Sequence, residues 1–451
     1  MSAKILIPLA VLMTASCASP GAQFSQRASR SVQHIVIVVQ ENRSFDNLFH
    51  GYPGADTVDY GITHDGTHVR LQPVSLAARY DISNNVTDFV KSYHGGTMDG
   101  FDLRLIGPRP GAEVPLAAAQ YPQYGFVPAA EVAPYFQIAH DFVLADRMFQ
   151  SNIDQSFVAH LYLIAGQANR TADFPSGRPW GCDAGPGARV ATLKDDRTLG
   201  ARIFPCFDIP TLADELDEKR LSWAYYAPKV LNAKAWRAQL LHSRDQFLEP
   251  SRLDVGQLWS SFDVIPHERY GPSWQTNIIS PSSRFFKDVA AGQLRSVSWV
   301  VPDYRNSDHA GSRSVTGPLW VASIINAIGR SRYWSHTVIL ITWDDSGGWY
   351  DHVAPPQLDY DGLGLRVPLL VVSPYSKRNF ISHKQYEFGS LLRFTESVFG
   401  LRALAPSDSR ANDLDDCFDF SAAQRTFEPI QTPIGAEDFL KQRPSSVPPD
   451  D

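Results

Sequence analysis

The chain contains several short apolar runs, rich in β-branched residues, and each run ends abruptly in polar residues or proline. The clearest are 34–39, 297–301, 337–342 and 368–372. Stretches with helical periodicity alternate with them, namely 211–221, which opens with a Thr211/Asp214 capping box, 319–328 and 386–399. Buried strands that alternate with helices form parallel sheets covered on both faces. We therefore expect an α/β protein in which all four runs are buried parallel strands.

Two long stretches interrupt this alternation. Residues 51–139 and 239–283 are rich in glycine, proline and polar side chains and show little sustained periodicity. A length of 451 residues does not require a second core, because α/β enzymes of this size often carry long insertions. We expect one catalytic domain over 30–420, with insertions that roof its active-site edge, and a C-terminal extension over 421–451.

The composition excludes several classes of protein. Hydrophobic residues make up 43% of the chain and charged residues 20%, which is ordinary for a globular protein. The net charge of −7 and the lack of a long Lys/Arg run give no attraction to a polyanion. Nucleic acid is therefore not expected as a partner, and no pattern indicates an obligate protein partner.

The N-terminus has the pattern of an export signal, with Lys4 followed by an apolar stretch, 5–13, and then small residues. The stretch is too short to span a bilayer, and its rival interpretation is a buried strand or helix. Residues 1–18 are expected to be a signal peptide. Its end resembles a lipoprotein processing site, so Cys17 is either lipidated, giving a membrane tether, or removed by cleavage after Ala18. Both alternatives predict a bacterial protein that is periplasmic, attached to the outer membrane or secreted.

Export permits the remaining cysteines to pair. Cys182 and Cys206 flank a polar loop rich in glycine and arginine, whereas Cys417 lies far away near the C-terminus. A zinc–thiolate site is the competing interpretation, but no CxxC or nearby Cys/His grouping supports it. We predict a Cys182–Cys206 disulfide and a free Cys417.

Carboxylates and an amide follow two of the predicted strands. Glu41 and Asn42 come after the run 34–39, and Asp344 and Asp345 come after 337–342. Ligands bind at the carboxyl ends of parallel strands, and adjacent aspartates repel each other unless a cation compensates. An isolated Asp pair would more simply cap a turn. The oxygen-rich set suits Ca²⁺, Mg²⁺ or Mn²⁺, and His309 or His352 nearby would permit Zn²⁺ or Fe.

The segment 151–166 begins as a polar loop and continues as an apolar helix. Ser156 therefore lies at or near a helix N-terminus, where an anion is favoured. His160 projects from the same helix face. The alternative is that Ser156 only caps the helix and His160 is a core histidine. His94, flanked by glycine, either approaches a ligand or decorates a turn.

Four segments together resemble a known family: 40–49 (QENRSFDNLF), 52–56 (YPGAD), 98–101 (MDGF) and 343–352 (WDDSGGWYDH). They are similar to the bacterial phosphoesterase family that contains secreted phospholipases C and respiratory-burst-inhibiting acid phosphatases, within the alkaline phosphatase superfamily. The resemblance extends from about His34 to Phe420.

The resemblance implies an alkaline-phosphatase-like α/β/α sandwich with a central, mostly parallel sheet and long insertions over the active site. It implies one divalent metal ion held by four residues, namely Glu41, Asn42, Asp344 and Asp345. It also implies that Ser156 is the nucleophile and becomes transiently phosphorylated. Three histidines resemble residues that hold phosphoryl oxygens or protonate the leaving group, namely His94, His309 and His352.

The substrate is less constrained than the reaction. Ser156 is followed by Phe-Val-Ala-His rather than by the Pro-Asn-Arg usual in the phospholipases, and a single His309 stands where the acid phosphatases have paired histidines. No long C-terminal β domain follows Phe420, which favours a compact, acid phosphatase-like hydrolase of phosphate monoesters. The alternative is a phospholipase C-type phosphodiesterase acting on phosphatidylcholine-like lipid head groups. A sulfatase is not supported, because the Cys/Ser-x-Pro-x-Arg stretch of that class is absent around Ser156. A non-enzymatic surface lipoprotein is also not supported, because a binding protein would not need a nucleophile beside a metal-binding set.

Overall fold

The computed structural model describes residues 20–107, 120–176, 180–228, 260–443 and 445. The predicted signal peptide with Cys17, the first part of the predicted second insertion (239–259) and the end of the C-terminal tail lie outside the described residues. No helix within the described ranges is both long and apolar enough to cross a membrane.

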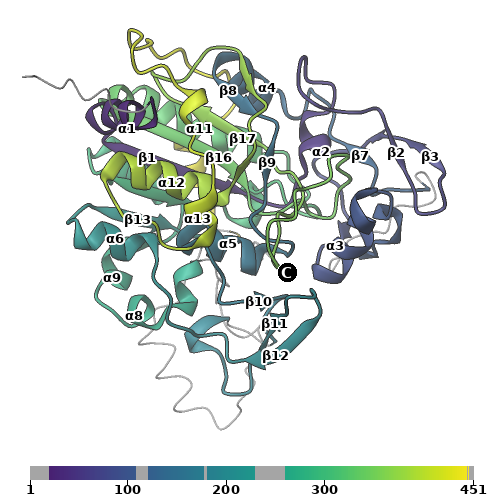
Figure 1. The fold of residues 1–451 in the computed structure, drawn as a ribbon. Helices are drawn as coiled ribbons and strands as arrows, with labels where there is room; N and C mark the ends of the chain where they lie inside the picture. The colour runs from purple at the N-terminus through teal and green to yellow at the C-terminus, as the bar shows by residue number, and fades with distance from the viewer. Residues whose placement is uncertain (1–19, 108–119, 177–179, 229–259, 444, 446–451) are drawn as a thin grey trace, which may run out of the picture.

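A sheet of eight strands among the described residues forms the centre of the protein (Figure 1). In spatial order the strands are β14 (Ile278–Ile279), β13 (Trp223–Tyr226), β15 (Val297–Val300), β1 (His34–Gln40), β16 (Thr337–Trp343), β17 (Leu369–Val372), β8 (Val143–Ala145) and β18 (Phe380–Ser382). β1 lies between β15 and β16 and is parallel to both. Its side chains alternate between two covered faces, which is why the run is apolar throughout.

The predicted direction of one strand is wrong. β17 runs antiparallel to both of its neighbours, β16 and β8, whereas the run 368–372 was expected to be parallel. The connection 344–368 contains no helix and returns from the same edge of the sheet at which β16 ends. A parallel strand would need a crossover to the opposite edge. A short, fully buried strand has the same apolar pattern in both directions.

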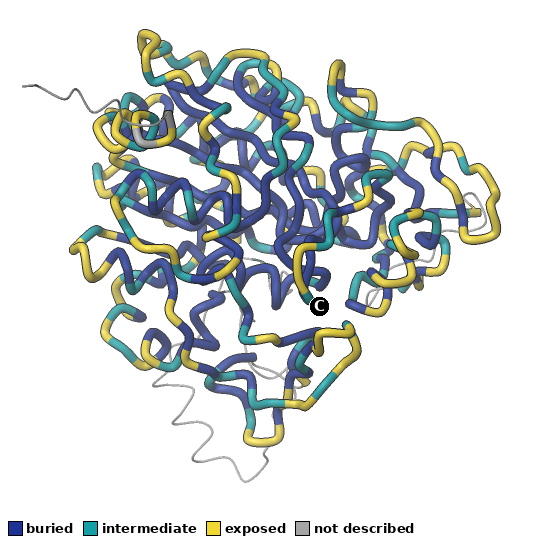
Figure 2. Tube along the Cα trace, viewed as in Figure 1, coloured by how far each residue is buried: buried dark blue, intermediate teal, exposed yellow. Residues whose placement is uncertain are grey.

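Helices cover both faces of the sheet (Figure 1). One layer consists of α1 (Pro20–Ser31), α5 (Ser156–Ala165), α6 (Leu212–Glu218), α12 (Phe388–Phe399) and α13 (Pro406–Arg410). The other consists of α4 (Ala133–Asp141), α10 (Arg284–Ala290), α11 (Gly317–Gly329) and α14 (Ala436–Lys441). The fold is therefore the expected α/β/α sandwich, and Figure 2 shows its strands and inner helix faces buried.

The predicted helices lie where the periodicity placed them. The Thr211/Asp214 capping box is present at the start of α6. The periodic stretch 319–328 falls inside α11, and 386–399 ends with α12 at Phe399. The first two residues of that last stretch instead form β19 (Tyr386–Glu387), which pairs with β9 (Met148–Phe149). α1 and α14, which pack against α12 and α11, lie outside the predicted 30–420 domain, whose boundaries stay a prediction.

The first insertion, together with the helix α2 just before it, consists of short elements at the carboxyl edge of the sheet. They are α2 (Phe45–Phe49), β2 (Tyr60–Ile62), β3 (His68–Arg70), β4 (Gln72–Pro73), β5 (Asp81–Ile82), α3 (Val86–Tyr93), β6 (Ile106–Gly107) and β7 (Gly125–Phe126). Many of its apolar side chains form a separate small core around Phe101 and Tyr124. The predicted stretch 51–139 also includes the start of α4, which belongs to the main helical layer.

The remaining described elements between α5 and β15 are small. A three-stranded antiparallel sheet contains β10 (Thr171–Ala172), β11 (Val190–Leu193) and β12 (Leu199–Ile203). Two short helices, α8 (Pro266–Arg269) and α9 (Ser273–Asn277), precede β14. The predicted Cys182–Cys206 disulfide is present, and Cys417 is free and buried, as predicted.

A buried arginine ties the segment 40–49 to the segment 343–352. Arg366 is fully buried, and its guanidinium donates to Asp351 at 2.8 Å and to Asp46 at 3.3 Å. Both aspartates are also fully buried. Since a buried charge is tolerated only when it is paired and hydrogen-bonded, this group holds the loops that follow β1 and β16 in one arrangement.

We expect Arg366→Met to lower the free energy of unfolding by about 3–5 kcal/mol, because it leaves two buried carboxylates without their cation. Urea unfolding followed by tryptophan fluorescence measures this change. The control is Arg378→Met, which removes an arginine from an exposed pair with Glu428 and should change stability little. Equal effects of the two substitutions would contradict this role for Arg366.

Candidate active site

The site begins where β1 and β16 end together. Their register pairs Gln40 with Trp343, so the next residues, Glu41 and Asp344, leave the sheet side by side. The backbone N–H of Asn42 donates to Asp344 Oδ1 at 2.9 Å. Both carboxylates are fully buried. The strand pairing thus places the carboxylates of Glu41 and Asp344 in one buried region.

Left-handed backbone brings the two loops into close approach. Asn42 has φ 56°, and Gly347 has φ 60°. A Cβ on Gly347 would lie 2.1 Å from the carbonyl oxygen of Asn42, so no side chain fits there. Glycine at this position is therefore required for the loop after β16 to lie against the loop after β1.

α5 contributes His160 to the two carboxylates. Its Nε2 lies 3.6 Å from Glu41 Oε1 and 3.7 Å from Asp344 Oδ2. The ligand atoms of these three buried residues all lie within 4.8 Å of one another. The sequence analysis did not decide whether His160 belongs to the site or to the core, and it did not include His160 among the metal ligands. Its spacing of four residues from Ser156 on one helix face was the signal that pointed to this edge.

Ser156 and Asp345 form the next contact. The Ser156 hydroxyl donates to Asp345 Oδ2 at 3.1 Å, while Asp345 Oδ1 accepts from Asn84 at 2.8 Å. Ser156 is the first residue of α5, and the N-cap position belongs to Gln155. Ser156 is therefore not the helix cap, and its hydroxyl is directed at a carboxylate of the site instead.

This set of residues fits one divalent cation. A positive charge would offset the fully buried carboxylates of Glu41 and Asp344, which approach the same imidazole. Asn42 is also buried, and none of the described residues donates a hydrogen bond to its Oδ1. Carboxylate and amide oxygens suit Ca²⁺, Mg²⁺ and Mn²⁺, and the imidazole of His160 adds a ligand that Zn²⁺ and Mn²⁺ accept. The residue set accommodates each of these ions.

A cavity of about 220 Å³ opens beside Ser156. Its lining includes Asn42, His309 and residues of the first insertion, among them Ile82, Asn84 and Leu105. The first predicted insertion therefore contributes to this cavity, whereas none of the described residues of the second, 260–283, lines it. Because polar and apolar side chains both line it, the cavity can bind a charged group and a partly apolar substituent.

His309 lines this cavity and is held by its neighbours. Its Nδ1 lies 2.7 Å from the carbonyl oxygen of Ala310, and since a carbonyl only accepts, Nδ1 carries the hydrogen. The preceding Asp308 accepts from the indole N–H of Trp343 at 2.9 Å and from the Tyr135 hydroxyl at 2.7 Å. Burial raises the pKa of Asp308 to about 6. Asp308 thus fixes the loop that carries His309 to the end of β16.

The structure does not bring His352 to the cavity. Its Nδ1 lies 2.7 Å from Asp46 Oδ2 and its Nε2 lies 3.2 Å from Asp56 Oδ1. His352 thus joins the group formed by Arg366, Asp46 and Asp351, called the Arg366 group below. Burial opposes the charge of the ring, but the hydrogen bond to Asp46 raises the pKa of His352 above its usual value. Both ring nitrogens are engaged in holding the two loops together.

His94 also lies apart from Ser156. Its side chain is 64% exposed, and Nδ1 contacts Asp99 at 2.7 Å. It ends α3 with φ 40° and is absent from the lining of the cavity. Of the three predicted histidines, the described structure places His309 alone at the cavity.

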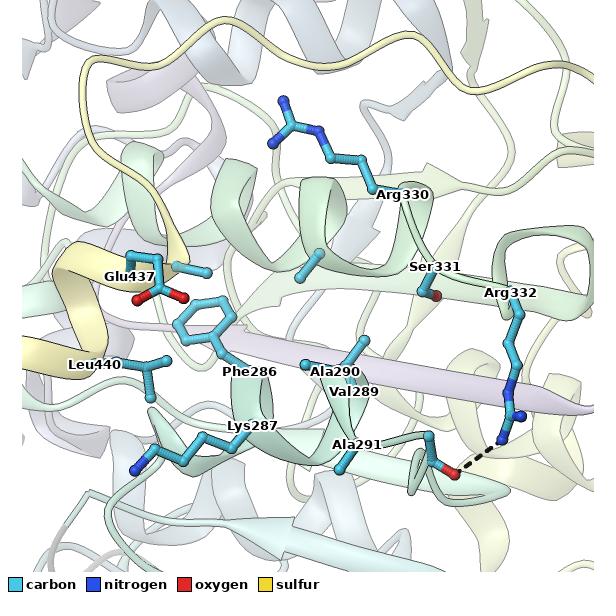
Figure 3. A pocket seen from close by; sticks show the side chains of 13 residues that line it. Phe286, Lys287, Val289, Ala290, Ala291, Arg330, Ser331, Arg332, Glu437 and Leu440 are labelled. Atoms are coloured by element: carbon cyan, nitrogen blue, oxygen red, sulfur yellow. Dashed lines mark hydrogen bonds between the residues drawn. The ribbon is translucent and has the colours of Figure 1, made fainter.

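A larger cavity of about 1050 Å³ lies elsewhere, between α10, α11 and α14. Figure 3 shows its rim residues Lys287, Arg330 and Glu437, with Arg332 bonded to the backbone. None of its lining residues follows the carboxyl end of a strand of the main sheet. Its position therefore gives no reason to place chemistry there.

Comparison with known proteins gives one family for most of the chain. The model of the Phosphoesterase family matches residues 32–402. The hemolytic phospholipase C of Pseudomonas aeruginosa is 25% identical over 92% of this chain and 59% of its own length. Phospholipase C A of Mycobacterium tuberculosis is 22% identical over 88% of this chain and 79% of its own length. A solved structure from Vibrio parahaemolyticus, of the alkaline phosphatase superfamily, covers 86% of this chain and 76% of its own at 10% identity and a TM-score of 0.33.

We expect Asp344→Asn, Asp345→Asn and His160→Gln each to lower the content of bound metal, because each removes a charge or a ligand from the buried group. Metal analysis of the purified variants by mass spectrometry measures this. His94→Gln is the contrasting variant and should retain the metal of the wild-type protein, because His94 is exposed and lies apart from the site. Full metal content in all three site variants would refute the assignment.

Proposed function

The chain belongs to the Phosphoesterase family, and we propose that it hydrolyses phosphate esters with Ser156 as the nucleophile. One observation carries this proposal: the Ser156 hydroxyl lies at the start of α5, 3.1 Å from Asp345, and lines the cavity beside Asn42. A serine with this surrounding can take a phosphoryl group and later release it to water.

Five residues would hold the metal ion: Glu41, Asn42, His160, Asp344 and Asp345. When bound, the ion supplies positive charge that stabilises the phosphoryl oxygens in the transition state. The sequence proposed four of these ligands, and the position of His160 supports adding the fifth.

Ser156 would attack phosphorus, forming a phosphoserine and releasing the alcohol of the substrate. Asp345 Oδ2 accepts the hydrogen bond of the hydroxyl, so it orients Oγ and can receive its proton. The first turn of α5 presents backbone N–H groups and the positive end of the helix dipole, which favour the anionic phosphoryl group. Water would then hydrolyse the phosphoserine.

His309 would protonate the leaving alkoxide. Since Nδ1 is bonded to the Ala310 carbonyl, the proton would move at Nε2. Imidazole titrates near neutral pH and can return as a base when water attacks the phosphoserine. His352 and Asp46 would act as positioning residues, because they hold the loops that carry the ligands.

The substrate we favour is a phospholipid head-group phosphodiester. The phospholipase C relatives over most of the chain support it. Leu105 lines the cavity and is 72% exposed, so it can contact an acyl or glycerol group at the rim. The second candidate is a phosphate monoester, which the acid phosphatase-like features of the sequence favour and which also suits a cavity of about 220 Å³.

We also propose that the protein is exported, to the periplasm, the outer membrane or the medium. The N-terminal pattern supports export, and the Cys182–Cys206 disulfide is typical of an oxidising compartment. A membrane tether through Cys17 remains part of this proposal.

We expect Ser156→Ala to abolish turnover while the protein stays folded, because the substitution removes the group that takes the phosphoryl. Enzyme quenched in acid during turnover should carry a phosphoryl group on the peptide that contains Ser156, detected by mass spectrometry. Ser273→Ala is a matched control, since Ser273 also begins a helix, α9, but lies outside the cavity. Substantial activity in the Ser156 variant would move the nucleophile to water.

Leu105→Ser should separate the two substrate classes. We expect it to lower hydrolysis of phosphatidylcholine vesicles by roughly tenfold, because burying a leucine side chain contributes about 1.5–3 kcal/mol. Hydrolysis of soluble p-nitrophenyl phosphate should change little. Leu358→Ser is the control, because Leu358 is also exposed but does not line the cavity. A wild-type protein that cleaves the monoester and not the lipid would establish the second candidate.

A further inference from the structure

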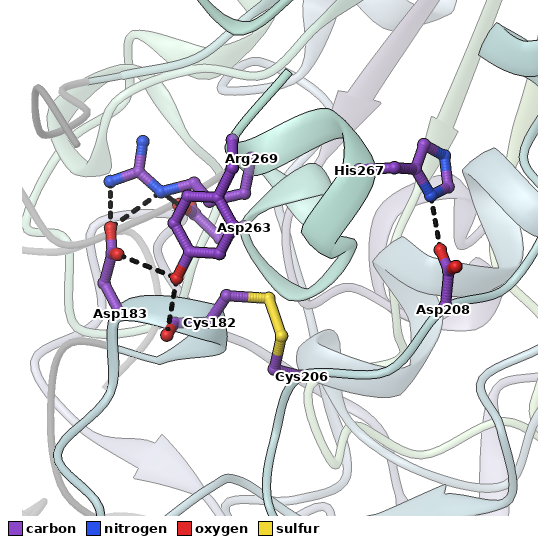
Figure 4. Close-up of a disulfide and its surroundings, with 8 residues drawn as sticks. Cys182, Asp183, Cys206, Asp208, Asp263, His267 and Arg269 are labelled. Atoms are coloured by element: carbon purple, nitrogen blue, oxygen red, sulfur yellow. Dashed lines mark hydrogen bonds and ion pairs between the residues drawn. A yellow bond between two sulfur atoms is a disulfide. The ribbon is translucent and has the colours of Figure 1, made fainter. Parts of the chain in front are cut away.

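A second histidine–carboxylate group lies near the disulfide and is not part of the proposed catalytic machinery. Asp214 belongs to α6, and His267 and Glu268 belong to α8. Figure 4 shows His267 and Asp208 in the surroundings of Cys206. None of these residues lines the cavity beside Ser156.

The three side chains converge. One ligand atom from each of Asp214, His267 and Glu268 lies within 4.8 Å of the other two. The Nε2 atom of His267 lies 3.0 Å from Asp214 Oδ1. Its other ring nitrogen, Nδ1, is hydrogen-bonded to Asp208 (Figure 4). A carboxylate on the far nitrogen of a histidine fixes the ring and raises its basicity, an arrangement typical of metal-binding histidines.

Glu268 gives an independent reason to place a cation here. The residue is only 4% exposed, and none of the described residues donates a hydrogen bond to its Oε2. A buried carboxylate oxygen without a donor is costly, and a bound cation would satisfy it.

The comparison with the Arg366 group supports this interpretation. Asp46, Asp351 and His352 also bring ligand atoms within 4.8 Å of one another, but Arg366 already supplies their positive charge. No lysine or arginine among the described residues forms an ion pair with Asp214 or Glu268. A metal bound by the group on α6 and α8 would supply the positive charge that Arg366 supplies in the other group.

We propose that Asp214, His267 and Glu268 bind one divalent transition-metal ion, with Zn²⁺ as the representative, separately from the catalytic metal. One imidazole nitrogen and two carboxylate oxygens are ligands that Zn²⁺ accepts, with water completing the coordination on the exposed side. The proposal does not depend on the proposed function.

The ion would join α6 to α8, since Asp214 and His267 are 53 positions apart in the chain. It would act beside the Cys182–Cys206 disulfide, which links residues 24 positions apart in the same region. Because the metal binds the folded arrangement, it would stabilise that arrangement in proportion to its concentration.

The test uses the full chain, freed of metal by chelation and titrated with Zn²⁺. Equilibrium dialysis with metal analysis should show about one more bound Zn²⁺ in the wild-type protein than in His267→Gln or Glu268→Gln. Asp208→Asn should weaken this site by about 10–100-fold, because it removes only the group that orients the ring. His140→Gln is the matched control: His140 is exposed and contacts Asp141 at 3.0 Å, but belongs to no such group.

Thermal unfolding gives a second readout that is independent of the catalytic site. In the Asp344→Asn background, Zn²⁺ should still raise the melting temperature, and adding His267→Gln should remove that increase. Circular dichroism without metal checks that each variant is folded. Equal Zn²⁺ binding by the wild-type protein and by both His267→Gln and Glu268→Gln would overturn the proposal, as would a melting temperature in the Asp344→Asn background that Zn²⁺ does not change.

Discussion

The in-register pairing of β1 with β16 is the constraint on which the rest of the site depends. It extends from His34 and Thr337 to Gln40 and Trp343, so both strands end at the same level. Glu41 and Asp344 then leave the sheet as buried neighbours, and a cation at this edge would offset their charge. His160 and Ser156 reach the same point from α5, whose Leu163 carbonyl accepts a hydrogen bond from the indole N–H of Trp299 in β15. The Arg366 group stabilises the loops that the pairing brings together.

Much of this arrangement could be predicted from the sequence, because strand ends and their polar followers are local patterns. The positions of Glu41, Asn42, Asp344 and Asp345 follow from two apolar runs and the rule that ligands bind at carboxyl ends. The direction of β17 could not be predicted, since burial erases the difference between parallel and antiparallel patterns. His160 was undecided because a buried histidine on an apolar helix has the same local pattern as a ligand.

The histidines that were predicted together separate for a physical reason. Gly347 and Gly348 both have positive φ, and this turn carries the chain from Asp345 towards Arg366 before it reaches His352. The seven positions between Asp345 and His352 in the sequence therefore did not bring His352 to the cavity. Asn84 and Leu105, which line the cavity beside Ser156, come from the first insertion, where sequence periodicity is weak.

The long sequence separation between the two halves of the site has a consequence for when it can exist. The contact from Asn42 to Asp344 spans 302 residues, and β1 also pairs with β15 from far along the chain. During synthesis from the N-terminus, β1 has neither neighbour until most of the polypeptide has emerged. Such non-local pairing folds slowly. A polypeptide that is exported unfolded would therefore have no assembled active site while it is still inside the cell. The topology of the fold would then delay activity until after export, without an inhibitor.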